Sequence, residues 1–172
     1  ESAELVAAQV QQQLSVQTLA IAEAQPRDAA ADWPMYHRDL AGTRFSPLTG
    51  ITTQNVGQLE LAWTYMFNRA DRERISGPSS FELYQQITPI VVDGVMYMPS
   101  GDRVVALLPA TGEELWVHEL DEGLASFRGV SYWPGDGDDD GDGGPRIFFT
   151  SLKKMIALNA ADGTRAESFG TN

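Results

Sequence analysis

Residues Asp93 to Gly112 read DGVMYMPSGDRVVALLPATG, and this stretch returns 51 residues later, without a gap, as GPRIFFTSLKKMIALNAADG at Gly144 to Gly163. The aligned pairs are of like character: Met96 with Ile147, Tyr97 with Phe148, Ser100 with Ser151, Val105 with Ile156, Ala106 with Ala157, Leu107 with Leu158 and Gly112 with Gly163. A repeat of this period is typical of propellers and solenoids, because each unit is one supersecondary element that cannot bury its apolar face alone.

Short strands with turn residues between them are predicted in and around both copies. Asp93-Gly94 is a signal for a two-residue type I′ hairpin turn, with apolar runs on either side of it. The predicted strands are 87–92, 95–99, 103–107 and 114–119 around the first copy, and 146–150 and 155–158 in the second. Four short antiparallel strands in close succession form the sheet of a propeller blade, so the fold class is all-β, a β-propeller.

An earlier blade is predicted to end at Trp63, which stands 53 residues before Trp116. Leu59 to Phe67 reads LELAWTYMF and is predicted to be a strand buried on both faces, because it is apolar and aromatic without clear alternation. The chain thus holds one complete blade, most of a second and the last strand of another. A closed propeller needs roughly four to eight blades, so we expect an N-terminal fragment of roughly two to three blades or one part of a larger assembly.

The composition is that of a globular domain and excludes several classes of function. Of 172 residues, 42% are hydrophobic and 21% charged, and the net charge of -12 argues against a nucleic acid or an anionic membrane surface as partner. A small or neutral ligand fits better. The absence of cysteine excludes disulfides, zinc-thiolate sites and thiol nucleophiles in this chain. No apolar run reaches the length of about 18 residues that a membrane span needs.

Packed structure is expected to begin near Asp32, so the chain divides into 1–31 and 32–172. The first part is predicted to be an N-terminal helix or flexible lead-in, followed by the linker Pro26 to Ala31. The apolar stretch Leu14 to Ala24 leaves a retained signal peptide as the alternative, although it lacks a basic region before it. The second part is the partial propeller.

Several segments of the second part resemble the N-terminal portion of the dehydrogenases that depend on pyrroloquinoline quinone (PQQ). They are Asp32-Trp33-Pro34, Thr43 to Leu48 (TRFSPL), Gln86 to Pro89 (QITP), Val91 to Tyr97 (VVDGVMY), Ala106 to Trp116 (ALLPATGEELW) and Arg128 to Gly135 (RGVSYWPG). The resemblance runs from Asp32 to the end of the chain and implies an eight-bladed propeller that oxidises alcohols or sugars. Ala106 to Trp116 matches the tryptophan-docking repeat of these propellers.

Three cofactor-binding residues follow from this resemblance. Arg128 matches the family arginine that pairs with PQQ, a flat tricarboxylate that a guanidinium fork suits; alternatively, it is a loop arginine bound to a local acid. Gln86 stands where alcohol-oxidising members carry glutamate and the membrane glucose dehydrogenase branch carries glutamine; alternatively, it is the polar first residue of a strand. Trp133 lies near the position from which that branch places a ring over the cofactor, although tryptophans also fill propeller cores.

Alcohol-oxidising relatives also place a vicinal disulfide shortly before this arginine, whereas here Asp121 to Phe127 reads DEGLASF. The resemblance is therefore greatest to the glucose dehydrogenase-like branch, which oxidises sugars and polyols.

The resemblance also implies a calcium ion, Ca²⁺, beside the cofactor, with its ligands and the catalytic base in later blades, so no catalytic residue is assigned to this chain. A separate acidic run, Asp136 to Asp142, fits the start of a calcium-loop pattern, with Asp136, Asp138 and Asp140 as weak candidate ligands. Ile147 stands where the pattern needs its bidentate glutamate. A solvated loop between strands is the alternative reading.

The function implied is that of an oxidoreductase that takes two electrons from a sugar, polyol or alcohol and passes them to a quinone or a cytochrome. Its partners would include the remainder of the propeller, and the chain alone is expected to be inactive. The resemblance places the protein in the periplasm, with any membrane association through a part outside this chain.

The alternative from another class is a cofactor-free propeller that serves as a protein-binding scaffold. It explains the repeat equally well, but it does not explain why Gln86 and Arg128 both stand where a cofactor pocket would need them.

Overall fold

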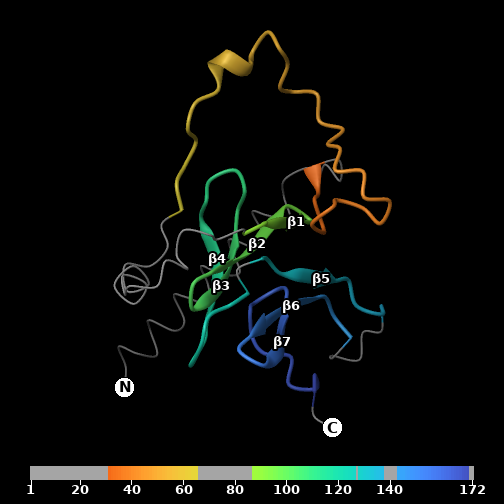
Figure 1. Cartoon of the computed structure of the whole chain (residues 1–172), viewed down its shortest axis with the longest axis vertical. Helices are drawn as coiled ribbons and strands as arrows, with labels where there is room; N and C mark the ends of the chain where they lie inside the picture. Colours follow the sequence, from red (N-terminus) through yellow and green to blue (C-terminus); the bar gives the residue numbers. More distant parts are fainter. Residues whose placement is uncertain (1–30, 66–86, 127, 138–142, 171–172) are drawn as a thin grey trace, which may run out of the picture.

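The computed structural model describes residues 31–65, 87–126, 128–137 and 143–170, which form two antiparallel β-sheets (Figure 1). The first sheet contains four strands in chain order: β1 (Ile90–Val92), β2 (Val95–Ser100), β3 (Arg103–Leu107) and β4 (Glu114–Glu119). The second contains three, β5 (Ser131–Trp133), β6 (Arg146–Ser151) and β7 (Lys154–Asn159). The predicted all-β, blade-like connectivity is confirmed. The division at residue 32 stays a prediction, because residues 1–30 lie outside the described part.

The remaining described segments connect or flank the sheets. A short 3₁₀ helix, η2 (Val56–Gln58), interrupts the long segment that precedes the first sheet. Among the described residues, no helix has the length and hydrophobicity that crossing a bilayer requires.

The hairpin between β1 and β2 forms as its sequence predicts. Asp93 and Gly94 have φ angles of 51° and 76°, which a type I′ turn requires, and Val92 pairs with Val95. Alternation along the strands then decides which face each side chain takes. The turn therefore sets the register of the first sheet.

The first sheet is buried on both faces. Val104 and Ala106 of β3 belong to one apolar cluster with Ile147 and Leu158 of the second sheet. Their neighbours on β3, Val105 and Leu107, point to the opposite face and pack with Trp63 and Tyr65, which come before the sheet in the chain. The first sheet is thus the middle layer between the second sheet and the segment around Trp63.

A tryptophan joins each pair of layers, and the two contacts repeat each other. The indole Nε1 of Trp116 on β4 donates to the carbonyl oxygen of Ala160 in the second sheet's last turn, at 3.0 Å. Trp63 Nε1 donates to the carbonyl oxygen of Pro109 in the corresponding turn of the first sheet, at 2.9 Å. The prediction that Trp63 is the counterpart of Trp116 is confirmed.

Glycines make room for these rings. A Cβ atom at Gly163 would lie 2.5 Å from Cε3 of Trp116, and one at Gly112 would lie 2.6 Å from Cε3 of Trp63. Both glycines have positive φ angles, 72° and 73°. The aligned glycines of the repeat are therefore docking sites for tryptophans as well as turn residues.

The strand predicted from Leu59 to Phe67 does not form within its described part, 59–65. This segment is extended but joins no sheet of the described residues, and Leu59 and Leu61 are 61% and 83% exposed. Only Trp63 and Tyr65 pack against the first sheet, where the Tyr65 hydroxyl donates to Oε1 of Glu114 at 2.6 Å. Apolar content alone indicated burial on two faces, whereas a ladder also needs a neighbouring strand.

Replacement of Gly163 by alanine should destabilise the intact protein far more than the same change at Gly94. Both positions have positive φ angles, but a Cβ at Gly94 meets nothing within 4 Å. We expect about 1 kcal/mol for Gly94→Ala from backbone strain alone. Gly163→Ala and Gly112→Ala should cost about 3 kcal/mol, because the tryptophan ring must also move. Urea unfolding measures the difference, and equal costs at the three positions would contradict the docking role.

His118 on β4 adds a pH-sensitive contact between the sheets. Its Nδ1 lies 2.8 Å from the carbonyl oxygen of Gly163, which can only accept, so Nδ1 carries the proton. Its Nε2 is buried and has no partner among the described residues. Burial lowers the pKa of His118 by more than the hydrogen bond to the Gly163 carbonyl raises it, and the charge of Arg165 adds a smaller lowering. At neutral pH the folded state therefore holds the neutral imidazole.

Stability should fall as the pH is lowered through the ordinary histidine pKa of about 6.5, because the unfolded chain then binds the proton that folded His118 resists. The contribution of the neutral ring is fully present above that pH. His118→Asn keeps an N–H donor and removes the titration, so its unfolding free energy should change less between about pH 7 and about pH 5. Denaturant unfolding across this range checks it, and an unchanged slope in the variant would contradict the assignment.

Candidate functional site

An open cleft of about 900 Å³ lies beside the start of β1. Three segments line it: Pro34, Met35 and Tyr36; Ile87 and Thr88; and Arg128, Gly129, Val130, Ser131 and Tyr132. The first segment precedes both sheets, the second leads into β1, and the third leads into β5. The cleft therefore forms only when all three are brought together by the fold.

A glycine brings Arg128 to the cleft. Gly129 has a φ angle of 123°, and a Cβ there would lie 2.8 Å from the carbonyl oxygen of Thr88. The turn is closed by two long hydrogen bonds, from Gly129 N to the Ser126 carbonyl and from Arg128 N to the Ser126 hydroxyl, both 3.4 Å. The loop thus packs its backbone against the approach to β1, which leaves the exposed Arg128 side chain at the cleft.

Residues 33–36, here called the strap, contribute Pro34, Met35 and Tyr36 to the lining of the cleft. Trp33 N donates to the Val91 carbonyl at 2.8 Å, and Val91 N donates to the Trp33 carbonyl at 3.0 Å. This antiparallel bridge adds the strap to the free edge of β1 and carries Pro34 to Tyr36 back towards Thr88. In Figure 1 the strap, in orange, lies next to β1.

Tyr132 remains a neutral hydrogen-bonding group at this site. Partial burial raises the pKa of its phenol, and the charges of Asp93 and then Asp32 add to the rise. The two acidic residues are neighbours, since Asp93 N donates to Oδ2 of Asp32 at 3.2 Å. The polar groups of the cleft are accordingly one guanidinium and several hydroxyls: Arg128, Tyr36, Thr88, Ser131 and Tyr132.

The structure places the three predicted cofactor residues differently. Arg128 lines the cleft. Gln86 lies outside the described residues, directly before the lining residue Ile87. Trp133 is not one of the lining residues, and the guanidinium carbon of Arg146 lies 5.6 Å from its ring centroid. Their roles toward a cofactor stay predictions.

The acidic run between β5 and β6 is described only in part. Asp136 is exposed, and its N–H donates to the Gly143 carbonyl at 3.3 Å, while Asp138 and Asp140 lie outside the described residues. Within the described ranges, no group of three or more His, Cys, Asp or Glu side chains could hold a metal ion. The calcium-loop reading and the solvated-loop reading both stay predictions.

Sequence reasoning did not select Met35, Tyr36, Thr88 or Ser131 as lining residues. Thr88 belongs to the same QITP segment as Gln86, and Ser131 to the same RGVSYWPG segment as Arg128, so those motifs contained the signal. Tyr36 has no such local signal. Its place depends on the bridge between Trp33 and Val91, which joins residues 58 positions apart.

Comparison with known proteins identifies a family over this region. The model of the glucose, ethanol and alcohol dehydrogenase β-propeller domain, PQQ type, matches residues 33–172. The chain is 31% identical to quinoprotein glucose dehydrogenase A of Acinetobacter calcoaceticus, over 88% of this chain and 21% of that protein. It is 40% identical to the 1-butanol dehydrogenase (cytochrome c) of Thauera butanivorans, over 80% of this chain and 18% of that protein.

A solved structure agrees with these sequence matches. The crystal structure of quinohemoprotein alcohol dehydrogenase from Comamonas testosteroni superposes with a TM-score of 0.56 at 26% identity, over 88% of this chain and 22% of that chain. The chain thus spans about a fifth of the length of the curated relatives it matches.

Proposed function

This chain belongs to the β-propeller family of the PQQ-type glucose, ethanol and alcohol dehydrogenases, and on that premise we propose that its cleft is one wall of a PQQ pocket. The whole protein would oxidise a sugar, polyol or alcohol. The observation that carries the proposal is the position of Arg128, exposed in the cleft on a turn that Gly129 packs against Thr88.

The groups present fit a flat, anionic ligand. The guanidinium of Arg128 presents several N–H donors in one plane, which matches a carboxylate better than a point charge would. Hydroxyls of Thr88, Ser131 and Tyr132 add neutral hydrogen-bonding groups, and Ile87 and Val130 supply apolar surface. The volume of the cleft lies within the range of about 300–1,000 Å³ that is usual for small-molecule pockets.

We assign roles to the chain's own residues accordingly. Arg128 would bind and orient a carboxylate of the cofactor. Tyr132, kept neutral by its raised pKa, would donate a hydrogen bond without adding negative charge beside a trianion. Gln86 would do the same from the position before Ile87. Trp133 keeps its predicted stacking role as a proposal, although the structure gives its ring the Arg146 guanidinium as a neighbour.

PQQ, when bound, supplies the acceptor of the two electrons that leave the substrate. The calcium ion that the family implies, and the base that takes the substrate proton, would be held by other blades.

A cytochrome is one proposed electron acceptor, supported by the name of the Thauera relative, and a quinone is the other. We propose a periplasmic location on family resemblance alone, with membrane association only through a part outside this chain.

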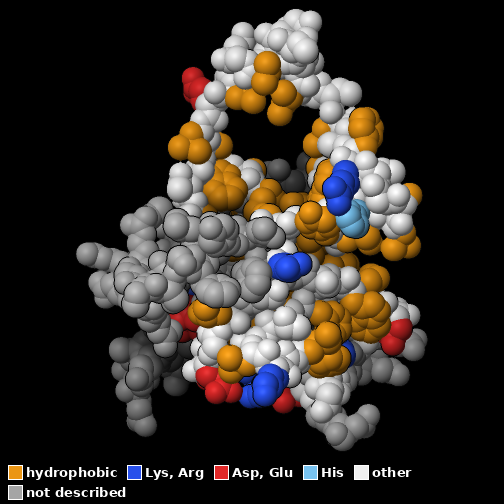
Figure 2. Space-filling view, viewed as in Figure 1, with side chains coloured by type: hydrophobic (Ala, Val, Ile, Leu, Met, Phe, Trp, Pro, Cys, Tyr) orange, Lys and Arg blue, Asp and Glu red, His pale blue; other side chains and the backbone are white. Residues whose placement is uncertain are grey.

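The remainder of the propeller is the proposed partner of residues 59–65. Trp63 repeats the docking of Trp116, so this segment occupies the position of a blade's last strand. Its leucines Leu59 and Leu61 are exposed, and so is Leu48 of residues 45–58, here called the arm, which precede it. Figure 2 shows the arm standing away from the rest of the molecule with apolar side chains along it. Three further strands beside this segment would complete a blade and cover it.

Hydrogen exchange tests this strand assignment in the intact protein. Amides of residues 60–65 should exchange at least about 100-fold more slowly than those of the loop 45–50, because ladder hydrogen bonds would protect them. Residues 45–50 are the matched control, since they belong to the same arm and precede the strand position. Equal, fast exchange in both segments would contradict the assignment.

Replacement of Arg128 should weaken cofactor binding. In the intact apoprotein, Arg128→Gln is expected to raise the Kd for PQQ about 10- to 100-fold, because a hydrogen bond to a charged group contributes about 1.5–3 kcal/mol. Arg165→Gln is the control, because it removes the same charge from an exposed arginine that does not line the cleft. Calorimetric titration measures both. A Kd unchanged by Arg128→Gln would sink the assignment of this cleft.

A further inference from the structure

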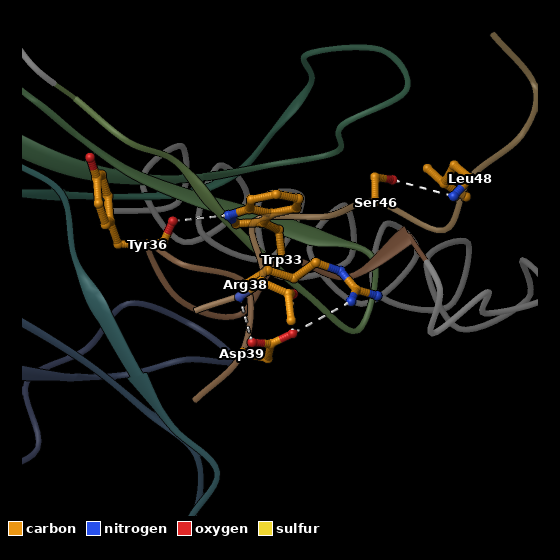
Figure 3. Close-up of polar contacts among 7 residues, drawn as sticks. Trp33, Tyr36, Arg38, Asp39, Ser46 and Leu48 are labelled. Atoms are coloured by element: carbon orange, nitrogen blue, oxygen red, sulfur yellow. Dashed lines mark hydrogen bonds and ion pairs between the residues drawn. The ribbon is translucent and has the colours of Figure 1, made fainter. Parts of the chain in front are cut away.

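Tyr36 is an aromatic lining residue of the cleft that belongs to neither the QITP nor the RGVSYWPG segment. The fold brings it to these two segments through the strap. The bridge between Trp33 and Val91 fixes the start of the strap on β1. The indole Nε1 of Trp33 also donates to the carbonyl oxygen of Tyr36, at 3.4 Å, which folds the strap's end back on its beginning (Figure 3). The backbone of Tyr36 is therefore held at two points.

The ring of Tyr36 is held as well. The guanidinium carbon of Arg44 lies 5.2 Å from its ring centroid, and the His37 ring meets it edge-on at 4.7 Å. Arg44 is itself fixed, because its Nε donates to Nδ1 of His37 at 2.9 Å and its backbone N–H donates to the His37 carbonyl at 3.2 Å. A cation against an aromatic face in this range is attractive.

The loop that carries Arg44 back to Tyr36 is closed by an acidic side chain. Asp39 accepts hydrogen bonds from the backbone N–H and the hydroxyl of Thr43, and these bonds lower the pKa of Asp39. Figure 3 shows Asp39 directed at Arg38 as well, with which it forms an ion pair at 4.0 Å. The loop thus has its own hydrogen bonds and returns Arg44 to the ring.

Despite this support, Tyr36 is 59% exposed and lines the cleft, whereas Arg44 does not line it. The ring contacts Arg44 and His37, and Tyr36 is a lining residue of the cleft that Arg128 also lines. Arg44 and His37 therefore hold the ring in place without burying it.

We propose that Tyr36 is a contact residue for the planar ring of the bound cofactor, and that Arg44 is the positioning residue that holds it there. The inference rests on the proposed function, since it takes PQQ as the occupant of the cleft. It assigns an aromatic surface to this site from the strap, whereas the sequence motifs offered only Trp133. Arg44 adds a second positive charge behind the ring, which favours an anionic ligand.

Binding of PQQ to the intact apoprotein, with Ca²⁺ present, tests the proposal by calorimetric titration. Tyr36→Ala and Tyr36→Leu should raise the Kd about tenfold, because a stacked aromatic contact is lost. Tyr36→Phe should stay within about twofold of the wild type, since it keeps the ring. Arg44→Gln should raise the Kd about threefold through loss of the ring's support and of the charge. Leu40→Ala is the matched control, because Leu40 lies in the same loop, is 95% exposed and does not line the cleft.

A thermal melt of each variant checks that it is folded. If Tyr36→Ala is unstable, the Kd values of Tyr36→Leu and Tyr36→Phe are compared instead. Weaker binding by the leucine variant together with wild-type binding by the phenylalanine variant and by Leu40→Ala supports a ring contact. Wild-type binding by Tyr36→Leu, while Arg128→Gln binds weakly, overturns the proposal and leaves the proposed function intact. Failure of the wild-type protein to bind PQQ overturns both.

Discussion

A tryptophan indole that fills the space left open by a glycine of the neighbouring sheet sets how successive layers of this protein pack. Trp116 on Gly163 and Trp63 on Gly112 make the same contact twice, each with an indole hydrogen bond to a turn carbonyl. The contact needs a glycine for two reasons, a positive φ angle and the absence of a Cβ. This double requirement explains why the repeat keeps a glycine at both aligned positions, 112 and 163.

The position of the cleft follows from this packing. Because the second sheet is held against the first, the loop before β5 reaches the approach to β1, where Gly129 meets the Thr88 carbonyl. The strap adds to the same edge through Val91. Arg128 and Tyr36, which lie 92 positions apart in the sequence, thereby border one space. Any ligand of this cleft contacts segments that only the tertiary structure brings together.

Local sequence signals predicted most of the described fold. The Asp93-Gly94 turn, the strands predicted on either side of it and the Trp63 to Trp116 spacing depend on neighbouring residues or on the repeat, and each is confirmed. No strand forms at 59–65, because a ladder needs a partner strand and the described residues provide none beside this segment. At the site, motifs pointed to Arg128, whereas Tyr36 depends on a long-range bridge and has no local signal. Family resemblance identified the chemistry; the structure identified which side chains share a space.

Taken together, the chain provides two blade-like sheets of a PQQ-type propeller and a cleft whose only arginine among the lining residues is Arg128. The most direct measurement is an experimental structure of the intact protein prepared with PQQ and Ca²⁺. The account predicts a PQQ carboxylate against the Arg128 guanidinium, with the cofactor beside Thr88. Cofactor bound elsewhere, with Arg128 directed away from it, would contradict the account.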